Sequence, residues 1–222
     1  MPKPANELYR RLRSQKHGIP QFTPEPNENL PTEYRKVGVS IGDVGVWSED
    51  SFDVLFNTCW PATYSINAAQ GVPKDFAPFP LERRDISRRL YHSPGTVIAS
   101  AKVTRISLSV GASSVVTPFF PTTVGSSVTF ELQSKECAML VLPEGASREK
   151  LLPVETFRAH VKRYSHDWYK FAGDRLPSSG FLFVVTGCDK TASWGIATAS
   201  TASRAIGVSL KFAVVGDDPQ LS

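Results

Sequence analysis

The clearest hydrophobic pattern in the chain is a helical stripe between residues 153 and 172. Large apolar side chains recur there at steps of three and four residues, at Val154, Phe157, Val161, Tyr164, Trp168 and Phe171. Pro153 suits the first turn of a helix, and Gly173 stands where a helix commonly ends. The pattern therefore predicts an amphipathic helix of about five turns that packs on a sheet.

Alternation of apolar and polar positions predicts strands elsewhere. It runs through residues 36–47 and 51–59, which predicts a hairpin that turns at 48–50. Gly42 and Gly45 bracket Asp43 and indicate a bulge or tight turn. Further strands are predicted at 96–110, 127–132, 138–142 and 205–215. Residues 111–125 predict a long turn whose Phe119 and Phe120 lie against the core.

The segment 181–186 contains six residues without a charge, which is typical of a strand buried on both faces and central in its sheet. With the segments above, it predicts an α+β fold. We expect a mostly antiparallel, β-sandwich-like sheet system with one long amphipathic helix, at about 153–172, packed on it.

The organisation along the chain predicts one globular domain, 37–216, with a basic, proline-rich N-terminal arm at 1–36 and a tail at 217–222. The arm carries a basic cluster, Arg10 to Lys16, in or next to a short helix at 6–14, and then follows an extended path. Two interpretations remain open. The arm wraps the domain surface, or it is a flexible basic tail for an anionic surface.

Residues 60–94 are punctuated by prolines and predict an irregular segment. Four arginines lie within it between 81 and 91, and a short helix there would place Arg84 and Arg88 on one face. That face is either solvated or an anion site.

Composition and charge narrow the class of protein. The 222 residues are 41% hydrophobic and 21% charged, which is typical of a globular chain and argues against disorder, collagen or a coiled coil. No apolar run reaches the roughly 20 residues that span a bilayer, and the polar start has no signal-peptide core. The net charge of +4 permits anionic partners. Dedicated nucleic-acid binders usually concentrate their positive charge more strongly on one face.

The three cysteines, Cys59, Cys137 and Cys188, are odd in number and far apart, and the four histidines are dispersed. This distribution argues against a zinc site and a disulfide framework. We therefore expect reduced thiols in a cytosolic or nuclear protein, and of the two we favour a cytoplasmic one.

Segment 187–194 concentrates chemically active side chains just beyond the apolar run at 181–186. We single out Asp189, Lys190, Thr191 and Trp194 as binding residues, together with Arg84 and Arg88. The alternative is that Asp189 and Lys190 form a turn and that Cys188 and Trp194 belong to the core.

The candidates for catalysis are weaker. Lys190 would favour the thiolate of Cys188, and His166 is a candidate base, although the helical periodicity turns His166 to solvent when Trp168 is buried. Asp43 offers a carboxylate to a metal without a second one near in sequence. We assign no catalytic residue, no metal site and no cofactor.

Several blocks, in this order, resemble a widespread family of uncharacterised mushroom (basidiomycete) proteins: residues 19–35, 41–45, 52–57, 142–146, 168–169, 185–190 and 193–197. The resemblance implies a cytosolic fungal protein and brings no site residues with it. The small-residue C-terminal hairpin, with its Val-Thr-Gly, is also similar to fungal gasdermin-like domains.

Four hypotheses follow from the sequence. The first is a non-catalytic intracellular recognition or scaffold domain that uses 187–194 and 81–92 to bind a protein or an anionic small molecule, with nucleic acid not favoured. The second is a gasdermin-like pore-forming or membrane-acting protein in which 192–210 becomes a transmembrane hairpin. The third is a cysteine-dependent enzyme, and the fourth is a self-assembling shell protein with a basic arm. The sequence predicts no oligomeric state.

Overall fold

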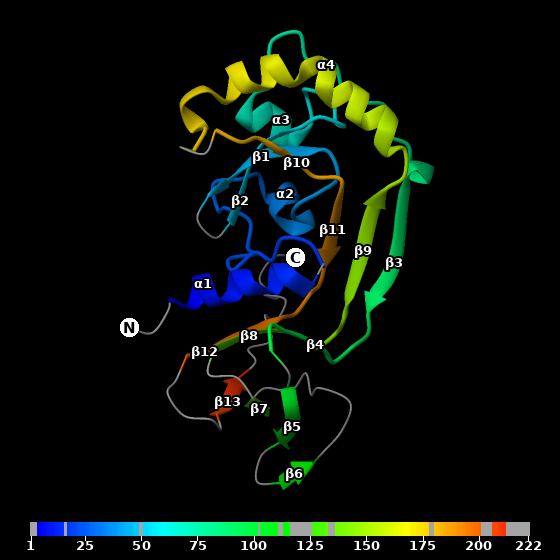
Figure 1. Ribbon diagram of the computed structural model, residues 1–222. Helices are drawn as coiled ribbons and strands as arrows, with labels where there is room; N and C mark the ends of the chain where they lie inside the picture. Colours follow the sequence, from blue (N-terminus) through cyan, green and yellow to red (C-terminus); the bar gives the residue numbers. More distant parts are fainter. Residues whose placement is uncertain are drawn as a thin grey trace. The chain divides into compact units, whose positions relative to one another are not determined.

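The computed structural model describes residues 4–15, 17–48, 51–101, 103–110, 113–115, 126–132, 136–177, 180–200 and 206–211 (Figure 1). The chain forms two compact units. Unit 1 comprises Met1–Phe22, Leu90–Ser147 and Lys190–Ser222, and unit 2 comprises Thr23–Arg89 and Arg148–Asp189. The predicted division into 1–36, 37–216 and 217–222 stays a prediction, and residues 217–222 lie outside the described residues.

The elements are short apart from one helix. The helices are α1 (Ala5–Tyr9), α2 (Thr32–Val37), α3 (Ser65–Gln70) and α4 (Val154–Ala172), with 3-10 turns at Arg10–Gln15, Arg83–Asp85 and Gly173–Arg175. The strands are β1 (Asp43–Ser48), β2 (Ser51–Asn57), β3 (Ile86–His92), β4 (Thr96–Ala99), β5 (Val103–Val110), β6 (Ser113–Val115), β7 (Ser126–Leu132), β8 (Glu136–Leu142), β9 (Ala146–Leu151), β10 (Phe183–Val184), β11 (Gly187–Lys190), β12 (Gly195–Ser200) and β13 (Ile206–Lys211).

Unit 2 is built on the sheet β10-β1-β2, with α4 packed on it (Figure 1). Trp168 and Ala172 of α4 are buried against Val44 and Phe56, and the Phe56 and Trp168 rings meet edge to face at 5.5 Å. The helix begins after Pro153 and ends at Gly173, whose φ of 48° is one that glycine adopts without strain. The predicted helix is confirmed. Of its apolar stripe, Phe157 and Trp168 are buried, and Val161, Tyr164 and Phe171 are partly buried against the core.

The β1–β2 hairpin is confirmed, and so is the predicted irregularity. The pairing register shifts between Val44 and Gly45, where a side chain on Gly45 would overlap the Asp53 carbonyl. The prediction of strand from residue 36 is wrong, because α2 extends to Val37 and β1 begins only at Asp43.

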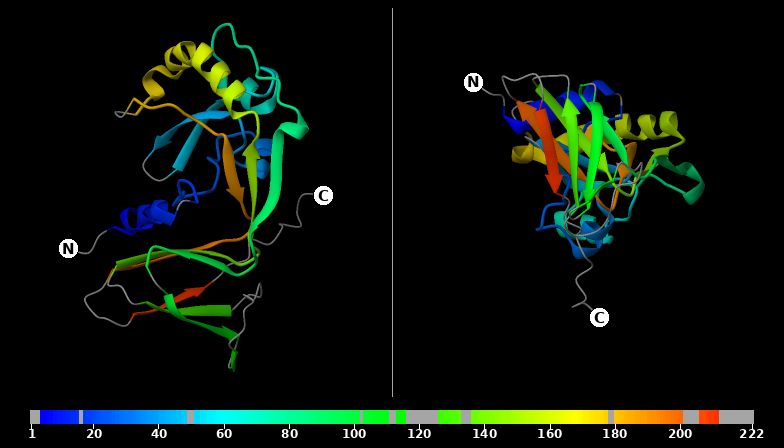
Figure 2. Two further views of the ribbon diagram at one scale, coloured as in Figure 1. Left: turned by 45° about the vertical axis from the view of Figure 1, so that its right-hand side comes forward. Right: turned by 90° about the horizontal axis from the view of Figure 1, so that it is seen from below.

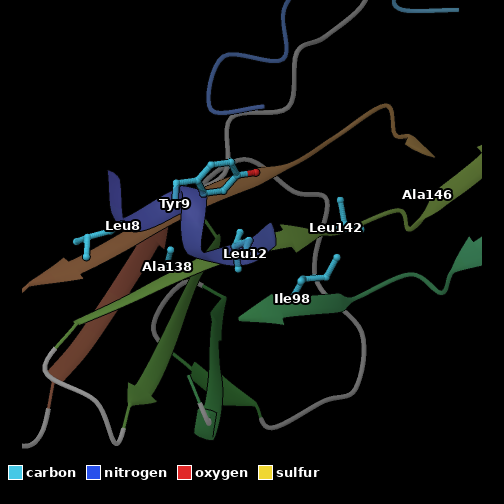
Figure 3. Packing of buried hydrophobic residues seen from close by; sticks show 7 residues of the cluster. All are labelled: Leu8, Tyr9, Leu12, Ile98, Ala138, Leu142 and Ala146. Atoms are coloured by element: carbon cyan, nitrogen blue, oxygen red, sulfur yellow. The ribbon is translucent and has the colours of Figure 1, made fainter. Parts of the chain in front are cut away.

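Unit 1 contains the antiparallel sheets β12-β8-β4 and β13-β7-β5-β6, which Figure 2 shows as successive layers. Helix α1 lies on the first of them, as Figure 3 shows, and the buried side chains there are Leu8, Tyr9, Leu12, Ile98, Ala138, Leu142 and Ala146. The start of the predicted arm therefore supplies three core residues to unit 1. Arg11, in the same segment, forms an ion pair with Glu136.

The strands predicted at 96–110, 127–132, 138–142 and 205–215 correspond to β4 with β5, β7, β8 and β13. Antiparallel sheets with one long helix make the fold α+β, as predicted. Phe119 and Phe120 lie outside the described residues.

Three local predictions are wrong. Segment 181–186 is not a central strand, because its strand β10 lies at one end of the sheet β10-β1-β2 and Phe181 is 61% exposed. Segment 60–94 is not irregular throughout, because it contains α3 and β3. Arg84 and Arg88 do not share a helix face, because Arg84 lies in a 3-10 turn and Arg88 in β3.

Candidate functional site

A further sheet, in the order β11-β9-β3, carries charged side chains on adjacent strands. Its residues in unit 2 are 86–89, 148–151 and 187–189. Gly187 of β11 lies beside β9, where an added Cβ would come 3.0 Å from the Glu149 carbonyl oxygen. Only the two ends of β9, Ala146 and Leu151, are buried. The middle of this sheet is therefore polar and open to solvent to varying degrees.

Ion pairs join the strands of this sheet. Arg148 donates from Nε and Nη2 to the two carboxylate oxygens of Asp189, each at 2.6 Å. On β3, Arg88 Nε lies 2.9 Å from Glu149 Oε1. Successive residues of a strand point to opposite faces, so Arg148 and Glu149 direct these pairs to opposite faces of the sheet. We call Arg88, Arg148, Glu149 and Asp189 the charged lattice.

The charged lattice is half-buried rather than fully hydrated. The Arg148 and Asp189 side chains are 27% and 21% exposed, and Glu149 is 14% exposed, whereas Arg88 is 63% exposed. A bidentate arginine–carboxylate pair is geometrically specific and stronger than a typical surface pair. The charged lattice thus links β9 to β11 and leaves the Arg88 side chain on β3 accessible to solvent.

The segment before β3 presents further arginines. Glu82 and Asp85 form a reciprocal capping box around the 3-10 turn. Arg84 pairs with Glu82 through Nε at 2.9 Å, and both side chains are largely exposed, at 80% and 60%. Arg83 and Arg89 are also exposed. Residues 83–89 therefore place four guanidinium groups along one short stretch of unit 2, which we call the arginine segment.

The six predicted binding residues divide between the units. Arg84, Arg88 and Asp189 belong to unit 2, and Lys190, Thr191 and Trp194 belong to unit 1. Thr191 Oγ1 lies 2.7 Å from the Gly145 carbonyl oxygen and 2.8 Å from that of Ser193, so it fastens two turns of unit 1. Trp194 packs against the core of unit 1. Residues 187–190 form β11 rather than a loop, and Asp189 is held in an ion pair rather than in a turn.

Cys188 and His166 lie in different surroundings. The Cys188 thiol is 3.5 Å from the Val39 carbonyl oxygen, an acceptor rather than a base. His166 is exposed on α4 while Trp168 is 3% exposed, which agrees with the helical periodicity. Strand alternation places Cys188 and Asp189 on opposite faces of β11.

Asp43, a candidate metal ligand in the sequence, is the centre of a buried hydrogen-bond network in unit 2. It is 0% exposed. Its Oδ2 accepts hydrogen bonds from the Tyr34 hydroxyl at 2.5 Å and the Ser40 amide at 2.6 Å, and its Oδ1 accepts one from Asn57 Nδ2 at 2.7 Å. Donors to both oxygens compensate for the loss of hydration on burial. We therefore assign this carboxylate a structural role.

Asn57 and Asn67 extend that network. Asn57 Oδ1 accepts from the Cys59 amide at 2.8 Å, and Asn67 Oδ1 accepts from the Asn57 amide at 2.7 Å. Asn67 Nδ2 donates to the Asn57 carbonyl at 2.9 Å. Burial, with the Asp43 charge as a second cause, raises the pKa of Cys59 to about 12. Burial and the same carboxylate also raise the pKa of Tyr34 well above its ordinary value. Both groups are therefore protonated and chemically quiet at neutral pH.

His160 lies at the edge of the α4 stripe. Its Nε2 is 3.3 Å from Thr58 Oγ1, and its ring meets those of Phe79 and Tyr164. Burial, and then the nearby Arg163 charge, lower the pKa of His160 below its ordinary value. The imidazole is thus neutral at physiological pH and serves packing.

Residue types alone gave little sign of the buried network. The only signal was Asp43 between two glycines, where Gly42 has a φ of +89° and a side chain there would overlap the Cys59 sulfur. Such a position requires glycine on two counts, conformation and space. Within the described part of the chain, no group of three or more His, Cys, Asp or Glu side chains is placed to hold a metal ion.

Segment 192–210, the focus of the pore-forming hypothesis, includes β12 and β13. β12 pairs with β8 over six residues, from Gly195 to Ser200, and β13 pairs with β7. Residues 201–205 lie outside the described part. Among the helices that the structure describes, none combines the length and apolarity needed to cross a bilayer.

Comparison with known proteins adds no relative. No protein-family model, curated protein or solved structure matches this chain. The candidate site therefore rests on geometry alone.

Proposed function

We propose that this chain is a non-catalytic recognition domain that binds a protein or an anionic ligand through the arginine segment of unit 2. The observation that carries the proposal is the exposed arginine on and before β3, next to a charged lattice that holds the sheet in place. Exposed polar residues on a rigid support are characteristic of binding surfaces. The polar groups best placed for chemistry, around Asp43, are instead sealed inside the fold.

Hydrogen exchange of the full chain tests this function. The chain is labelled in three samples: without a probe, with oligoglutamate, and with oligolysine as the charge-reversed probe. We expect oligoglutamate to slow exchange in peptides covering 82–92 and 148–151, and oligolysine to leave them unchanged. Protection by both probes, protection confined to other segments, or no protection would each contradict the proposal. The interaction should also weaken as salt rises, because exposed charges are screened.

A further inference from the structure

The arginine segment leads into the outer strand of a sheet. In the sheet order β11-β9-β3, β3 is an outer strand, and among the described strands only β9 pairs with it (Figure 1). An outer strand presents a row of backbone N–H and C=O groups that another chain can pair with. The first four residues of β3, 86–89, belong to unit 2 with the rest of the arginine segment.

Charge decides what can pair with that edge. Arg88 and Arg89 are consecutive and exposed, so they point to opposite faces of the sheet. Antiparallel pairing of β3 over its full length with a second copy would set Arg89 opposite Arg89, and like charges placed opposite each other on paired strands are destabilising. An incoming strand with carboxylates at two consecutive positions would meet a guanidinium group on each face. The edge therefore selects against self-association and for an acidic strand.

We propose that β3 binds an extended acidic peptide segment by strand addition, with Arg88 and Arg89 each facing one of two consecutive acidic residues. This inference rests on the proposed recognition function and specifies its partner. Backbone hydrogen bonds to the edge supply affinity, and the two guanidinium groups supply the choice of sequence. Arg83 and Arg84, just before the strand, extend the positive surface for further acidic residues.

The test measures fluorescence anisotropy of a labelled peptide, Thr-Val-Glu-Asp-Val-Thr, against the full chain. Two matched peptides keep the charges but carry N-methyl groups on alternate residues, the odd positions in one peptide and the even positions in the other. Alternate N–H groups of a strand point to opposite edges, so one of the two peptides loses the N–H groups that face β3. Because each lost backbone hydrogen bond contributes about 1 kcal/mol, we expect at least one N-methylated peptide to bind roughly tenfold more weakly or worse.

Protein variants supply the second arm. Arg89→Glu should weaken binding of the unmodified peptide on the order of tenfold, because it replaces an attraction with a repulsion across paired strands. Lys162→Glu makes the same charge change at an exposed position on α4 and should have no effect. Arg89→Gln, which removes charge without repulsion, covers the case in which Arg89→Glu disturbs folding. Circular dichroism verifies the fold of each variant.

The outcomes separate the two proposals. Equal binding of all three peptides, still weakened by Arg89→Glu, would overturn strand addition and leave the recognition function standing. No binding, or binding insensitive to both Arg89 variants, would overturn both. Sedimentation velocity adds one check. A dimer that Arg89→Glu disrupts would overturn the acidic partner in favour of a second copy of this chain.

Discussion

The sheet of β1 and the sheet of β9 both place carboxylates on strands, yet they satisfy them in opposite ways. Asp43 is fully buried and accepts hydrogen bonds from neutral donors, the Tyr34 hydroxyl, the Ser40 amide and the Asn57 side chain. Asp189 and Glu149 meet arginines at partly exposed positions. A buried carboxylate held by such a network has little contact with solvent, and leaving any member without a partner is costly. A half-exposed ion pair contributes less to stability but remains available to a partner. The difference predicts that the first region determines stability and the second determines binding.

The strongest challenge to this comparison is removal of the Asp43 carboxylate. Asp43→Ala leaves three buried donors without their acceptor, and each unsatisfied group costs about 1–3 kcal/mol. We expect the free energy of unfolding to fall by about 3–5 kcal/mol in urea titrations. Asp174→Ala, at an exposed position after α4, is the matched control and should change it little. Equal losses in the two variants would refute the structural role of Asp43.

The next effect concerns the backbone that supports Asp43. Gly42 and Gly38 both have positive φ, +89° and +70°, but a Cβ at Gly42 overlaps Cys59 while nothing lies within 4 Å of one at Gly38. Alanine at either position carries backbone strain of about 1–3 kcal/mol. Gly42→Ala adds overpacking of a similar size, so thermal unfolding should show it clearly less stable than Gly38→Ala. If both variants melt together, the close approach to Cys59 has no energetic weight.

A smaller effect is expected in the charged lattice. A double-mutant cycle on Arg148 and Asp189, with alanine at each position, should give a coupling of about 1 kcal/mol or less that decreases with salt. The same cycle on Arg88 and Glu149 should give a smaller coupling, since Arg88 is 63% exposed. Couplings of several kcal/mol would show that the charged lattice is a main determinant of stability, and would contradict its assignment to binding.

The smallest effect is in pH dependence. The pKa of His160 is lowered in the folded state, so the unfolded chain binds more protons as pH falls through 6.5. Stability should therefore decrease from pH 7.5 toward the folded-state pKa and then become independent of this group. His160→Gln should flatten that slope in urea titrations. A slope that persists in His160→Gln would assign it to other groups.

The sequence predicted the parts of the fold where one periodicity dominates. The α4 stripe follows directly from spacing, because Trp168 and the partly buried Val161, Tyr164 and Phe171 pack on the same core. The β1–β2 hairpin follows from two runs of strand-forming residues around a short turn. The apolar run at 181–186, in contrast, led to a wrong prediction. Its composition is that of a central strand, but within this segment the strand consists of Phe183 and Val184, it is the outer strand of its sheet, and Phe181 is exposed. Apolar content alone does not distinguish an inner strand from an outer one.

The candidate site was predictable only in part. Arg84, Arg88 and Asp189 were singled out, but their partners Glu82, Arg148 and Glu149 were not, and the pairs with β9 join residues far apart in sequence. β3 and β11 are too polar to show the alternation that marks a half-buried strand. Thr191 and Trp194 are of residue types common in binding sites. In unit 1, however, Thr191 bonds to the Gly145 carbonyl and Trp194 packs against the core. Pairing between distant strands is information that a local pattern does not contain.

The way the chain divides between its units has a consequence for the order in which they can form. Unit 2 draws its last residues from 148–189, whereas the core of unit 1 combines Leu8 and Tyr9 with Ile196. During synthesis from the N-terminus, unit 2 can close as soon as Asp189 has left the ribosome. In unit 1 the side chains of Leu8, Tyr9 and Leu12 first meet partners from β4 and β8, and Ile196 of β12 joins this cluster only after residue 189. The core around α1 is therefore completed later than unit 2.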